Sequence, residues 1–459
     1  MENIAQLDNP QLKVHHWHPM ADPKSAEQSP PLVFERAQGV YIHDTDGKRY
    51  LDTQGGLWCV NVGHGREEVK QAINAQMDKL PYYTTFGDTS NLPVMELAER
   101  LTRMLAPEGM QRVFFSSGGS DANETALKLA RQYWKLAGEA QRTKFISLKQ
   151  GYHGVHFGGT SIGGQMYLRS MYEPVLPGCF QVDTPWLYRN PYTDDPEELG
   201  KICAGLLERE ILHHGPHTVA AFIAEPVQGA GGVIVPPDNY WPLVRQVCDK
   251  YGVLLIADEV VTGFGRSGSM FGCRGWGVKP DIMCLAKGIN SGYIPLGATV
   301  VNERVRQAWD SDHPLAAILH GYTYSGHPLA CAAANAALQI VEDEALPANA
   351  ARVGSYCLAK LKNELAHFDF VGDIRGKGLM MAVELVTDKP SKESFMPGDP
   401  FLELIQDLTR REGLLIRNLG SNLIISPPLV FSNEDVDEMV QILALVFDKA
   451  QPDFSTRAG

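Results

Sequence analysis

The sequence predicts an α/β protein, with a mainly parallel central sheet covered by helices and a smaller α+β domain beside it. Between about residues 65 and 325, short apolar segments alternate with longer segments of helical periodicity. Strands of a parallel sheet are buried on both faces, so they are apolar at nearly every position, and the helices between them cover those faces. After about residue 328 the pattern changes to long helices followed by separate strands, which indicates the second domain.

The composition narrows the classes of protein to which this chain can belong. Of the 459 residues, 44% are hydrophobic and 21% are charged, as in an ordinary globular protein. The formal charge of −13 and the lack of a basic stripe disfavour a nucleic-acid-binding protein. No apolar run approaches the roughly 20 residues that span a bilayer, and no secretory signal is visible at the start. The eight cysteines form no Cys-x-x-Cys pair, so we expect reduced thiols in a cytoplasmic protein. The charge and the short apolar runs lead us to expect no nucleic-acid or membrane partner.

Residues 1–64 are predicted to form an N-terminal arm and part of the smaller domain. Up to about residue 38 the chain is polar and aperiodic, so we expect an arm that packs on another surface. Asp46-Gly47 then separates two β-rich segments, 39–44 and 48–52, and predicts a hairpin. Three histidines near the start could bind a metal, but no acidic or cysteine partner stands at ligand spacing, so we predict no metal site. They are His15, His16 and His18.

Residues 65–327 form the predicted large domain, and residues 328–459 the C-terminal part of the small one. In the large domain the expected strands are 112–115, 145–148, 219–224, 253–258, 282–285 and 298–301. Its expected helices are 67–79, 93–105, 121–137, 198–213 and 239–251. Beyond it we expect helices at 327–344, 350–364, 400–412 and 433–449 and strands near 378–385 and 422–426. Ser432 followed by Asp435 resembles a capping box at the start of the last helix.

Two short motifs resemble the sites of other enzyme classes but lack the context that those sites need. Gly263 to Gly268 match G-x-G-x-x-G, and Asp281 stands about where a ribose-binding acid would. Dinucleotide binding needs a helix that opens at the third glycine, and the glycine-rich continuation cannot form one. Gly159 to Gly163 match G-x-S-x-G, but they lie in what we expect to be a glycine-rich loop rather than between a strand and a helix. Dehydrogenase and hydrolase functions are therefore disfavoured.

Two features of the alternating region favour a ligand with a phosphate and a planar ring. A Ser/Gly turn leads from a strand into a helix at Gly119 and Ser120, where free backbone N–H groups could hold a phosphate. A plain helix cap is the alternative. Tyr152, between two glycines after strand 145–148, could lie flat on a planar ring. A core tyrosine in a tight turn is the alternative there.

Two further features place ionisable groups at strand ends. Asp258 ends a near-continuous apolar strand, and a buried cationic ring nitrogen would be a natural partner for its carboxylate. A carboxylate that simply reaches solvent is the alternative. Lys287 lies between an apolar strand and a glycine-rich loop, where desolvation can lower the pKa of an amine and make it nucleophilic. A surface lysine is the alternative.

Together the four features are the parts needed to hold pyridoxal 5′-phosphate. Lys287 would form the Schiff base, and Asp258 would keep the pyridine nitrogen protonated so that the ring accepts electrons. Tyr152 would stack on one face of the ring, and Val260 would cover the other. Three longer runs carry a resemblance to a known family. They are Glu225-Pro226-Val227-Gln228-Gly229, the run from Asp258 to Arg266, and the run from His320 to Pro328.

With these runs the chain resembles, over nearly its whole length, the class III, fold-type I, pyridoxal-phosphate-dependent aminotransferases. The resemblance implies that Gly119 and Ser120 form the phosphate cup and that Gln228 lies near the phenolic oxygen of the ring. It implies that Glu225 helps to shape the site. Thr323 would reach the cofactor phosphate of a neighbouring subunit, so the resemblance also implies a homodimer or tetramer with shared active sites.

The run 57–63 is similar to the ω-amine:pyruvate branch of this family, in which Trp58 would line the substrate pocket and Arg417 would bind a carboxylate. An exposed arginine on a strand is the alternative for Arg417. The resemblance implies ping-pong transfer of an amino group from an ω-amine to pyruvate, and within the branch the sequence is most similar to enzymes of putrescine and related polyamines. β-Alanine, taurine or an arylalkylamine as donor remain open. So do decarboxylation or aminomutase chemistry on the same cofactor, and a non-catalytic cofactor-binding protein.

Overall fold

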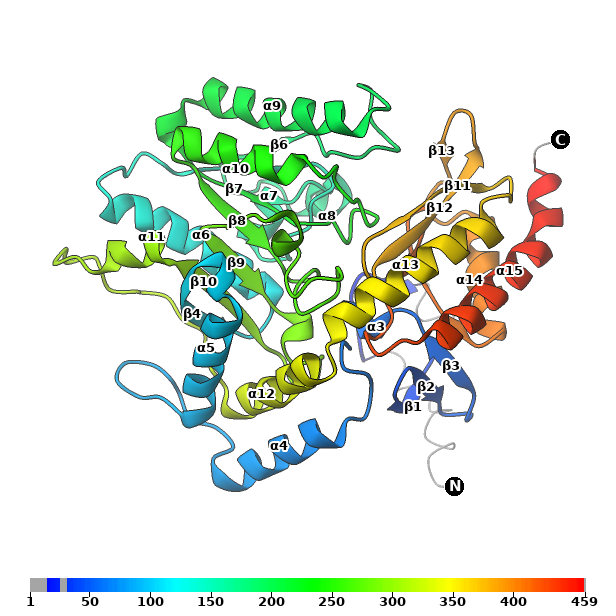
Figure 1. Ribbon diagram of the computed structural model, residues 1–459, viewed down its shortest axis with the longest axis horizontal. Helices are drawn as coiled ribbons and strands as arrows, with labels where there is room; N and C mark the ends of the chain where they lie inside the picture. The colour runs from blue at the N-terminus through cyan, green and yellow to red at the C-terminus, as the bar shows by residue number, and fades with distance from the viewer. Residues whose placement is uncertain (1–14, 25–30, 458–459) are drawn as a thin grey trace.

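A seven-stranded sheet forms the centre of the protein, whose computed structural model describes residues 15–24 and 31–457 (Figure 1). The strand order is β4-β10-β9-β8-β7-β5-β6. The strands are β4 (Met110–Ser116), β5 (Lys144–Leu148), β6 (Cys179–Val182), β7 (Val219–Ala224), β8 (Leu254–Asp258), β9 (Ile282–Leu285) and β10 (Gly297–Asn302). Strands β5 to β9 pair in parallel, and β10 runs antiparallel to both β4 and β9. The predicted mainly parallel sheet is therefore confirmed.

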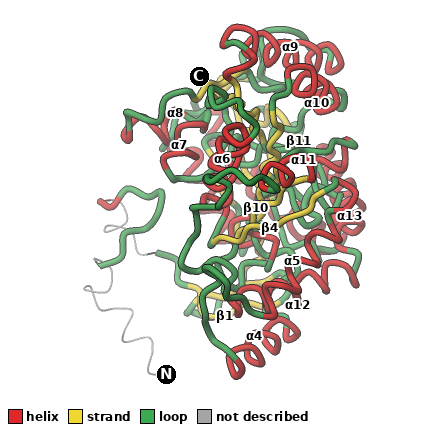
Figure 2. Tube along the Cα trace, turned by 90° about the vertical axis from the view of Figure 1, so that its left-hand side faces the viewer, coloured by secondary structure: helices red, strands yellow, loops and turns green. Residues whose placement is uncertain are grey.

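Alternate residues of these strands point to opposite faces, and helices cover both of them (Figure 2). On β9, Ile282 and Cys284 pack with α6 (Gly119–Leu136), whereas Met283 and Leu285 pack with α5 and α12. Burial on both sides explains why the strands are apolar throughout. The other helices around this sheet are α4 (Glu67–Lys79), α5 (Leu92–Met104), α7 (Phe157–Ile162), α8 (Met166–Arg169), α9 (Pro196–His214), α10 (Tyr240–Tyr251), α11 (Glu303–Arg306) and α12 (Pro328–Asp343).

The N- and C-terminal segments meet in two smaller sheets. One has the order β1-β2-β3-β14, with β1 (Phe34–Gln38), β2 (Tyr41–Asp44), β3 (Arg49–Asp52) and β14 (Leu414–Leu415). The other has the order β11-β12-β16-β15, with β11 (Val371–Gly376), β12 (Met381–Asp388), β16 (Asn422–Ile425) and β15 (Arg417–Leu419), and β13 (Glu393–Ser394) pairs with β12. Because β14 pairs in parallel with β3, segments from opposite ends of the chain share one sheet (Figure 1). Helices α13 (Leu346–Leu365), α14 (Pro400–Arg411) and α15 (Asn433–Ser455) cover these strands.

Most of the expected elements are present, and two expectations are wrong. The predicted hairpin forms between β2 and β3, and α15 begins with the predicted capping box. Residues 34–38 are not part of an aperiodic arm but form strand β1, whose mostly exposed residues leave no apolar pattern. The expected glycine-rich loop at 157–162 is instead helix α7, and the Ser161 hydroxyl donates back to the carbonyl of Phe157. Strands β6 and β11 were not predicted, since β6 has only four residues and β11 carries Asp373 and Arg375.

Two predicted absences, of a membrane span and of a metal site, can be compared with the structure only for the residues that it describes. Within residues 15–24 and 31–457, none of the helices is long and apolar enough to cross a membrane. The rings of His16 and His18 lie 4.6 Å apart. Over the same residues, no group of three or more His, Cys, Asp or Glu side chains is arranged to hold a metal ion.

Candidate active site

The ends of β8 and β9 bring Asp258 and Lys287 to one edge of the central sheet. The two strands are neighbours and run in parallel, with Asp258 paired to Cys284. Asp258 is the last residue of β8, and Lys287 follows two residues after β9 ends at Leu285. Carboxyl ends of parallel strands form the edge at which α/β sheets bind ligands. The topology therefore puts the two predicted catalytic groups where a ligand would meet both.

Asp258 is buried, with 3% of its surface exposed, so the alternative of a carboxylate that reaches solvent is wrong. Its Oδ2 atom accepts hydrogen bonds from Asn123 Nδ2 and lies 2.8 Å from His153 Nδ1, and its Oδ1 atom accepts from the amide of Val260. These partners orient the carboxylate and offset the free-energy cost of burying it. Sequence reasoning gave no role to His153 or Asn123. His153 stands beside Tyr152 in the same glycine-flanked turn, which was a usable signal, whereas Asn123 is an ordinary position of α6.

Lys287 occupies a strained position and carries an amine with a lowered pKa. Its φ is +48°, in the left-handed region that non-glycine residues seldom occupy. The residue as a whole is only partly buried, but burial of the amine lowers its pKa, and the charge of Arg417 lowers it further. Cys59, Asp258 and Glu225 act in the opposite direction. Among the residues described, no hydrogen bond holds the amine, so it is free to react with a bound carbonyl group.

The start of α6 forms a cradle for an anion. Gly119 and Ser120 are its first two residues, where backbone N–H groups have no acceptor within the helix. A Cβ atom at Gly119 would lie 2.8 Å from the side chain of Val260, and one at Gly154 would lie 2.5 Å from Ser120 Oγ. Glycine at these two places keeps the cradle open. Ser120 Oγ also accepts a hydrogen bond from the amide of Val155, 3.2 Å away.

Glu225 and Gln228 lie beside Tyr152 at the neighbouring strand end. Glu225 accepts hydrogen bonds from the amides of Tyr152 and Gly229, at 3.0 and 2.9 Å. Burial raises the pKa of Glu225 to about 7, with His153 acting to lower it and Asp258 to raise it. Gln228 donates from Nε2 to the carbonyl of Lys149, but its buried Oε1 has no partner among the described residues. An unpartnered buried acceptor is costly, so a donor on a ligand would satisfy it.

Trp58 and Arg417 approach from the terminal segments. Trp58 is only 3% exposed, and its φ of +68° again falls in the left-handed region. It packs in an apolar cluster with Val227, Val233, Met380, Ala382 and Ile424. Arg417 begins β15, where it pairs with Ile424, and it is partly buried rather than exposed.

Burial lowers the pKa of Arg417, and the phenols of Tyr167 and Tyr152 act to raise it. In the described part of the chain, the guanidinium of Arg417 has no carboxylate within ion-pair distance. An enclosed guanidinium without a counter-ion is well suited to receive a carboxylate from outside. Tyr167, on α8, was missed by sequence reasoning because its short helix follows no recognised motif.

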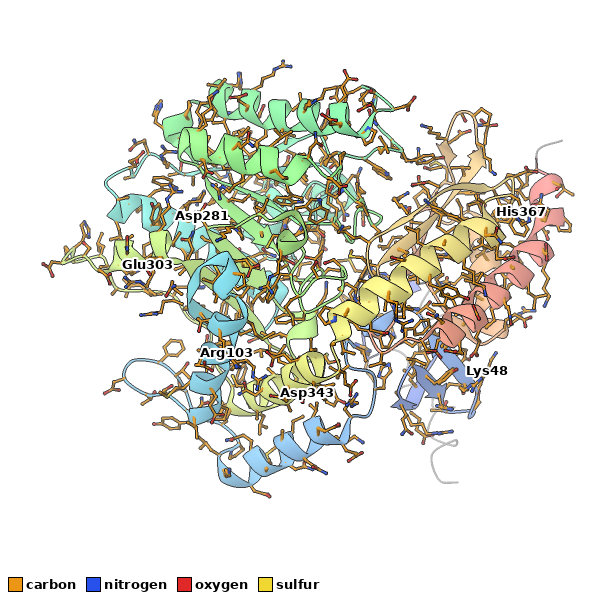
Figure 3. All side chains as sticks on the ribbon, in the orientation of Figure 1. Lys48, Arg103, Asp281, Glu303, Asp343 and His367 are labelled. Atoms are coloured by element: carbon orange, nitrogen blue, oxygen red, sulfur yellow. The ribbon has the colours of Figure 1, made fainter. Side chains whose placement is uncertain are left out.

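Thr323 and Asp281, the acid considered above as a ribose ligand, lie apart from this arrangement. Thr323 is exposed in the loop before α12, where its carbonyl accepts a hydrogen bond from Tyr82, and no described contact joins it to the strand-end residues. Asp281 precedes β9 at its amino end, opposite to the ligand edge. It accepts hydrogen bonds from Arg245 and from the amide of Leu255. Asp281 lies between Arg245 of α10 and Arg304 of α11 (Figure 3). It is a structural carboxylate and not a ribose ligand.

The donors and acceptors at this edge fit pyridoxal 5′-phosphate. The α6 cradle suits its phosphate, the buried Asp258 carboxylate suits its ring nitrogen, and the orphaned Gln228 oxygen suits a ring substituent. A family model described as aminotransferase class-III matches residues 23–447. The chain belongs to the class III aminotransferases.

Three relatives show how similar the chain is to known members of the family. It is 42% identical over 435 residues to the putrescine–pyruvate aminotransferase of Pseudomonas aeruginosa, covering 95% of this chain and 94% of the relative. It is 39% identical to an adenosylmethionine-8-amino-7-oxononanoate aminotransferase of Geobacter sulfurreducens, covering 93% and 94%. An amine transaminase structure from an uncultivated Pseudomonas species, in its PLP-bound (internal aldimine) form, superimposes with a TM-score of 0.93 at 54% identity, covering 95% and 99%.

These comparisons confirm the expected class of enzyme. The protein is a class III aminotransferase of fold type I that uses pyridoxal 5′-phosphate, and its structural neighbours are amine and ω-transaminases. Its substrates are a small-molecule amine and a keto acid. The relatives named above act on different amines, so the family alone leaves the donor of this chain open.

Proposed function

We propose that this aminotransferase moves the terminal amino group of an ω-amine to pyruvate, giving an aldehyde and L-alanine by a ping-pong mechanism. Putrescine or a related polyamine is the favoured donor. The observation that carries the proposal is the partly buried Arg417 guanidinium, whose charge lowers the pKa of Lys287 and which has no carboxylate partner of its own among the described residues. Support for the donor comes from the 42% identity with a putrescine–pyruvate aminotransferase.

The roles proposed for the residues of the cofactor edge follow from their positions. When bound, pyridoxal 5′-phosphate supplies a ring that accepts electrons from the substrate Cα. Lys287 would hold the carbonyl carbon of the cofactor, and its free amine would move the proton between the substrate Cα and C4′. Asp258 holds the proton on the ring nitrogen. Gly119 and Ser120 bind the phosphate through their free amides.

The remaining residues enclose the ring and the substrate. Tyr152 stacks on one face of the ring, and Val260 covers the other face from its position against Gly119. Gln228 lies near the phenolic oxygen. Two more residues complete the pocket in this proposal. Glu225 shapes it by holding the amides of Tyr152 and Gly229, and Trp58 lines its substrate side.

The Arg417 guanidinium would attract the substrate of one half-reaction and repel that of the other. A keto-acid carboxylate can form two parallel hydrogen bonds with its guanidinium. A diamine brings a second ammonium group, which the same cation would repel, so Arg417 swings aside or is screened while the amine is bound. β-Alanine or another ω-amino acid would instead present its own carboxylate, and an arylalkylamine would present an apolar group to Trp58. These donors are the alternatives within the same reaction.

A donor panel with purified enzyme and pyruvate tests the proposal. Alanine formation from pyruvate is measured with putrescine, cadaverine, spermidine, β-alanine, taurine and 1-phenylethylamine, and glutamate formation is measured with the same donors and 2-oxoglutarate as acceptor. We expect the largest kcat/KM for a polyamine with pyruvate. Alanine formed fastest from β-alanine, or glutamate formed faster than alanine, would contradict the donor or the acceptor. Carbon dioxide or a rearranged amine as product would favour decarboxylation or aminomutase chemistry instead.

We further propose that the enzyme works as a homodimer, or a tetramer built from such dimers, in which Thr323 reaches the cofactor phosphate of the neighbouring subunit. Five large apolar or aromatic side chains are exposed around the Thr323 loop. They are Tyr82, Tyr83, Phe86, Leu319 and Tyr324. Burying such a group between subunits would remove apolar surface from water. Sedimentation should give a dimer or tetramer mass, and a monomer at assay concentrations would contradict the proposal. Cytoplasmic localisation stays a prediction.

A further inference from the structure

The loop that follows Gln228 is held in a strained conformation. Gln228 and Ile234 form an antiparallel bridge, and in the turn between them Gly229, Gly232 and Val233 are buried, whereas Ala230 and Gly231 are partly buried. At its tip Val233 has a φ of +53°, which is unfavourable for a β-branched side chain, and Gly232 has a φ of +111°. Backbone strain of this kind persists only where neighbouring groups hold it.

Arg375, on strand β11, holds this turn by its carbonyl oxygens. Its Nε and NH2 atoms lie 3.0 and 2.6 Å from the Gly232 oxygen, and Nε also lies 3.2 Å from the Val233 oxygen. The remaining N–H groups donate hydrogen bonds to Asp373, Glu384 and Asn422, at 2.8, 2.5 and 2.8 Å. The whole donor set of the guanidinium is therefore engaged. Since five N–H groups in a fixed fork serve five partner residues, a lysine could not replace them.

The same guanidinium reaches the strands that carry Arg417. Asn422 begins β16, where it pairs with Glu384 on one side and with Leu419 on the other. Leu419 ends β15, which begins at Arg417, and Asn422 Nδ2 donates to the Leu419 carbonyl. Arg375 thus touches the turn that follows Gln228 through Gly232, and the Arg417 strand pair through Asn422.

We propose that Arg375 is a positioning residue that ties the loop carrying Gln228 to the strand pair carrying Arg417. It keeps residues 229–233 in their strained turn and so fixes where the unpartnered Gln228 oxygen meets the cofactor ring. It also fixes the distance from that ring to the guanidinium that receives the keto acid. This inference rests on the roles proposed above for Gln228 and Arg417.

Arg189 provides a matched control because it shares the surroundings of Arg375 without touching the loop. Its Nε lies 2.5 Å from the other oxygen of Glu384, its NH2 donates to Ser394, and it lies over the same Trp186 ring. Arg375→Met and Arg189→Met each remove one cation from Glu384. Only the first frees the carbonyls of Gly232 and Val233. A loss of stability that comes from Glu384 alone should therefore affect both variants similarly.

Three measurements on the holoenzyme separate positioning from stability. Amide hydrogen exchange of residues 229–235 should be about tenfold faster in Arg375→Met than in Arg189→Met, which is about 1.4 kcal/mol of local opening. The visible absorbance band of the bound cofactor should shift in Arg375→Met only. KM for pyruvate should rise about tenfold while kcat changes less. Arg375→Lys should recover thermal stability but not the exchange rate or the band.

The outcomes distinguish failure of this inference from failure of the proposed function. Equal exchange rates and equal absorbance bands in the two methionine variants would overturn the inference, even if the wild-type protein converts putrescine and pyruvate rapidly. If the wild-type protein forms no alanine from any amine, the proposed function fails. The exchange and absorbance measurements need no turnover, so they would still decide whether Arg375 holds the loop.

Discussion

The cofactor edge and the substrate side of this site are built in different ways. Asp258 and Lys287 follow neighbouring strands of one sheet, and a register fixed by backbone hydrogen bonds brings them together. Trp58 and Arg417 come from opposite ends of the chain. Ile424 links them, since it packs in the cluster of Trp58 and pairs with Arg417 across β15 and β16. A local pattern therefore builds the cofactor edge, and long-range packing builds the substrate side.

This difference has a consequence for how the two sides respond to mutation. A strand-end residue can be changed while the sheet behind it stays the same, so the effect should fall on chemistry. Residues of the substrate side belong to an apolar cluster and to small sheets, so changes there should alter substrate affinity and the fit between segments more than the chemical step.

The largest effect is expected at Lys287. Lys287→Ala removes both the group that binds the cofactor carbonyl and the group that moves the Cα proton, so the rate should fall by about 10³-fold or more. Alanine formation from amine and pyruvate measures it, and borohydride reduction followed by mass analysis should find no cofactor attached at this position. Lys250→Ala, at an exposed lysine of α10, serves as control and should keep full activity. A labelled peptide containing position 287 in the Ala variant would refute the assignment.

The second largest loss of activity is expected for Asp258→Asn. It removes the charge that holds a proton on the ring nitrogen but keeps the hydrogen-bonding shape, so kcat should fall by roughly 10²- to 10³-fold. Asp281→Asn is the comparison, because Asp281 is also a buried carboxylate beside β9 but lies at the opposite end of the strand. It should lower thermal stability and leave the rate of the folded, loaded enzyme nearly unchanged. Similar losses of kcat in both variants would mean that burial of a charge, and not its place at the ligand edge, matters.

A pH effect is expected from Glu225, whose pKa burial raises to about 7. An acid with a raised pKa in the folded state contributes stability that is present below its unfolded pKa of about 4.5 and is lost as pH rises through 7. The loss amounts to about 3 kcal/mol for a shift of this size. Thermal unfolding of the cofactor-free protein at pH 5 and pH 8, compared with Glu225→Gln, measures it. The wild type should lose stability relative to the variant on going to pH 8, and a constant difference would contradict the prediction.

Arg417→Ala examines the substrate side directly. A charge-assisted, bidentate contact is worth about 1.5–3 kcal/mol, so KM for pyruvate should rise roughly 10- to 100-fold. The amine half-reaction, followed by loss of the cofactor's visible band under single turnover, should slow much less, since a diamine makes no carboxylate contact there. Arg411→Ala, an exposed arginine of the preceding helix, should change neither value. Full activity of Arg417→Ala with pyruvate would contradict the proposal that Arg417 binds the carboxylate of pyruvate.

The smallest effect is expected far from either side of the site, at the cap of α15. Ser432 accepts a hydrogen bond from the amide of Asp435, and Asp435 accepts one from the amide of Ser432. Ser432→Ala should therefore lower stability by about 1 kcal/mol without changing kcat or KM. Ser355→Ala, at an exposed serine inside α13, should change stability by less than about 0.5 kcal/mol. An altered KM for pyruvate in Ser432→Ala would show that α15 is coupled to Arg417.

The parts of the site that sequence reasoning found share one property, namely that a local pattern encodes them. Asp258 and Lys287 each stand at the boundary between a fully apolar strand and a glycine-rich turn, and Gly119 and Ser120 stand between a strand and a helix. His153, Asn123 and Tyr167 were missed because their roles depend on distant partners. Asn123, for example, is a polar residue of a helix until β8 brings Asp258 within 2.8 Å of it.

The sequence by itself determined the elements, the parallel sheet and the family, because strands buried on both faces and turns at strand ends leave patterns that span only a few residues. Only the tertiary structure decided which side chains meet. It brought His153 and Asn123 to Asp258, placed Trp58 against Ile424, and set Arg375 on the carbonyls of Gly232 and Val233. Such contacts join residues far apart in the chain, and their energy depends on distance and burial, which no single stretch of sequence contains.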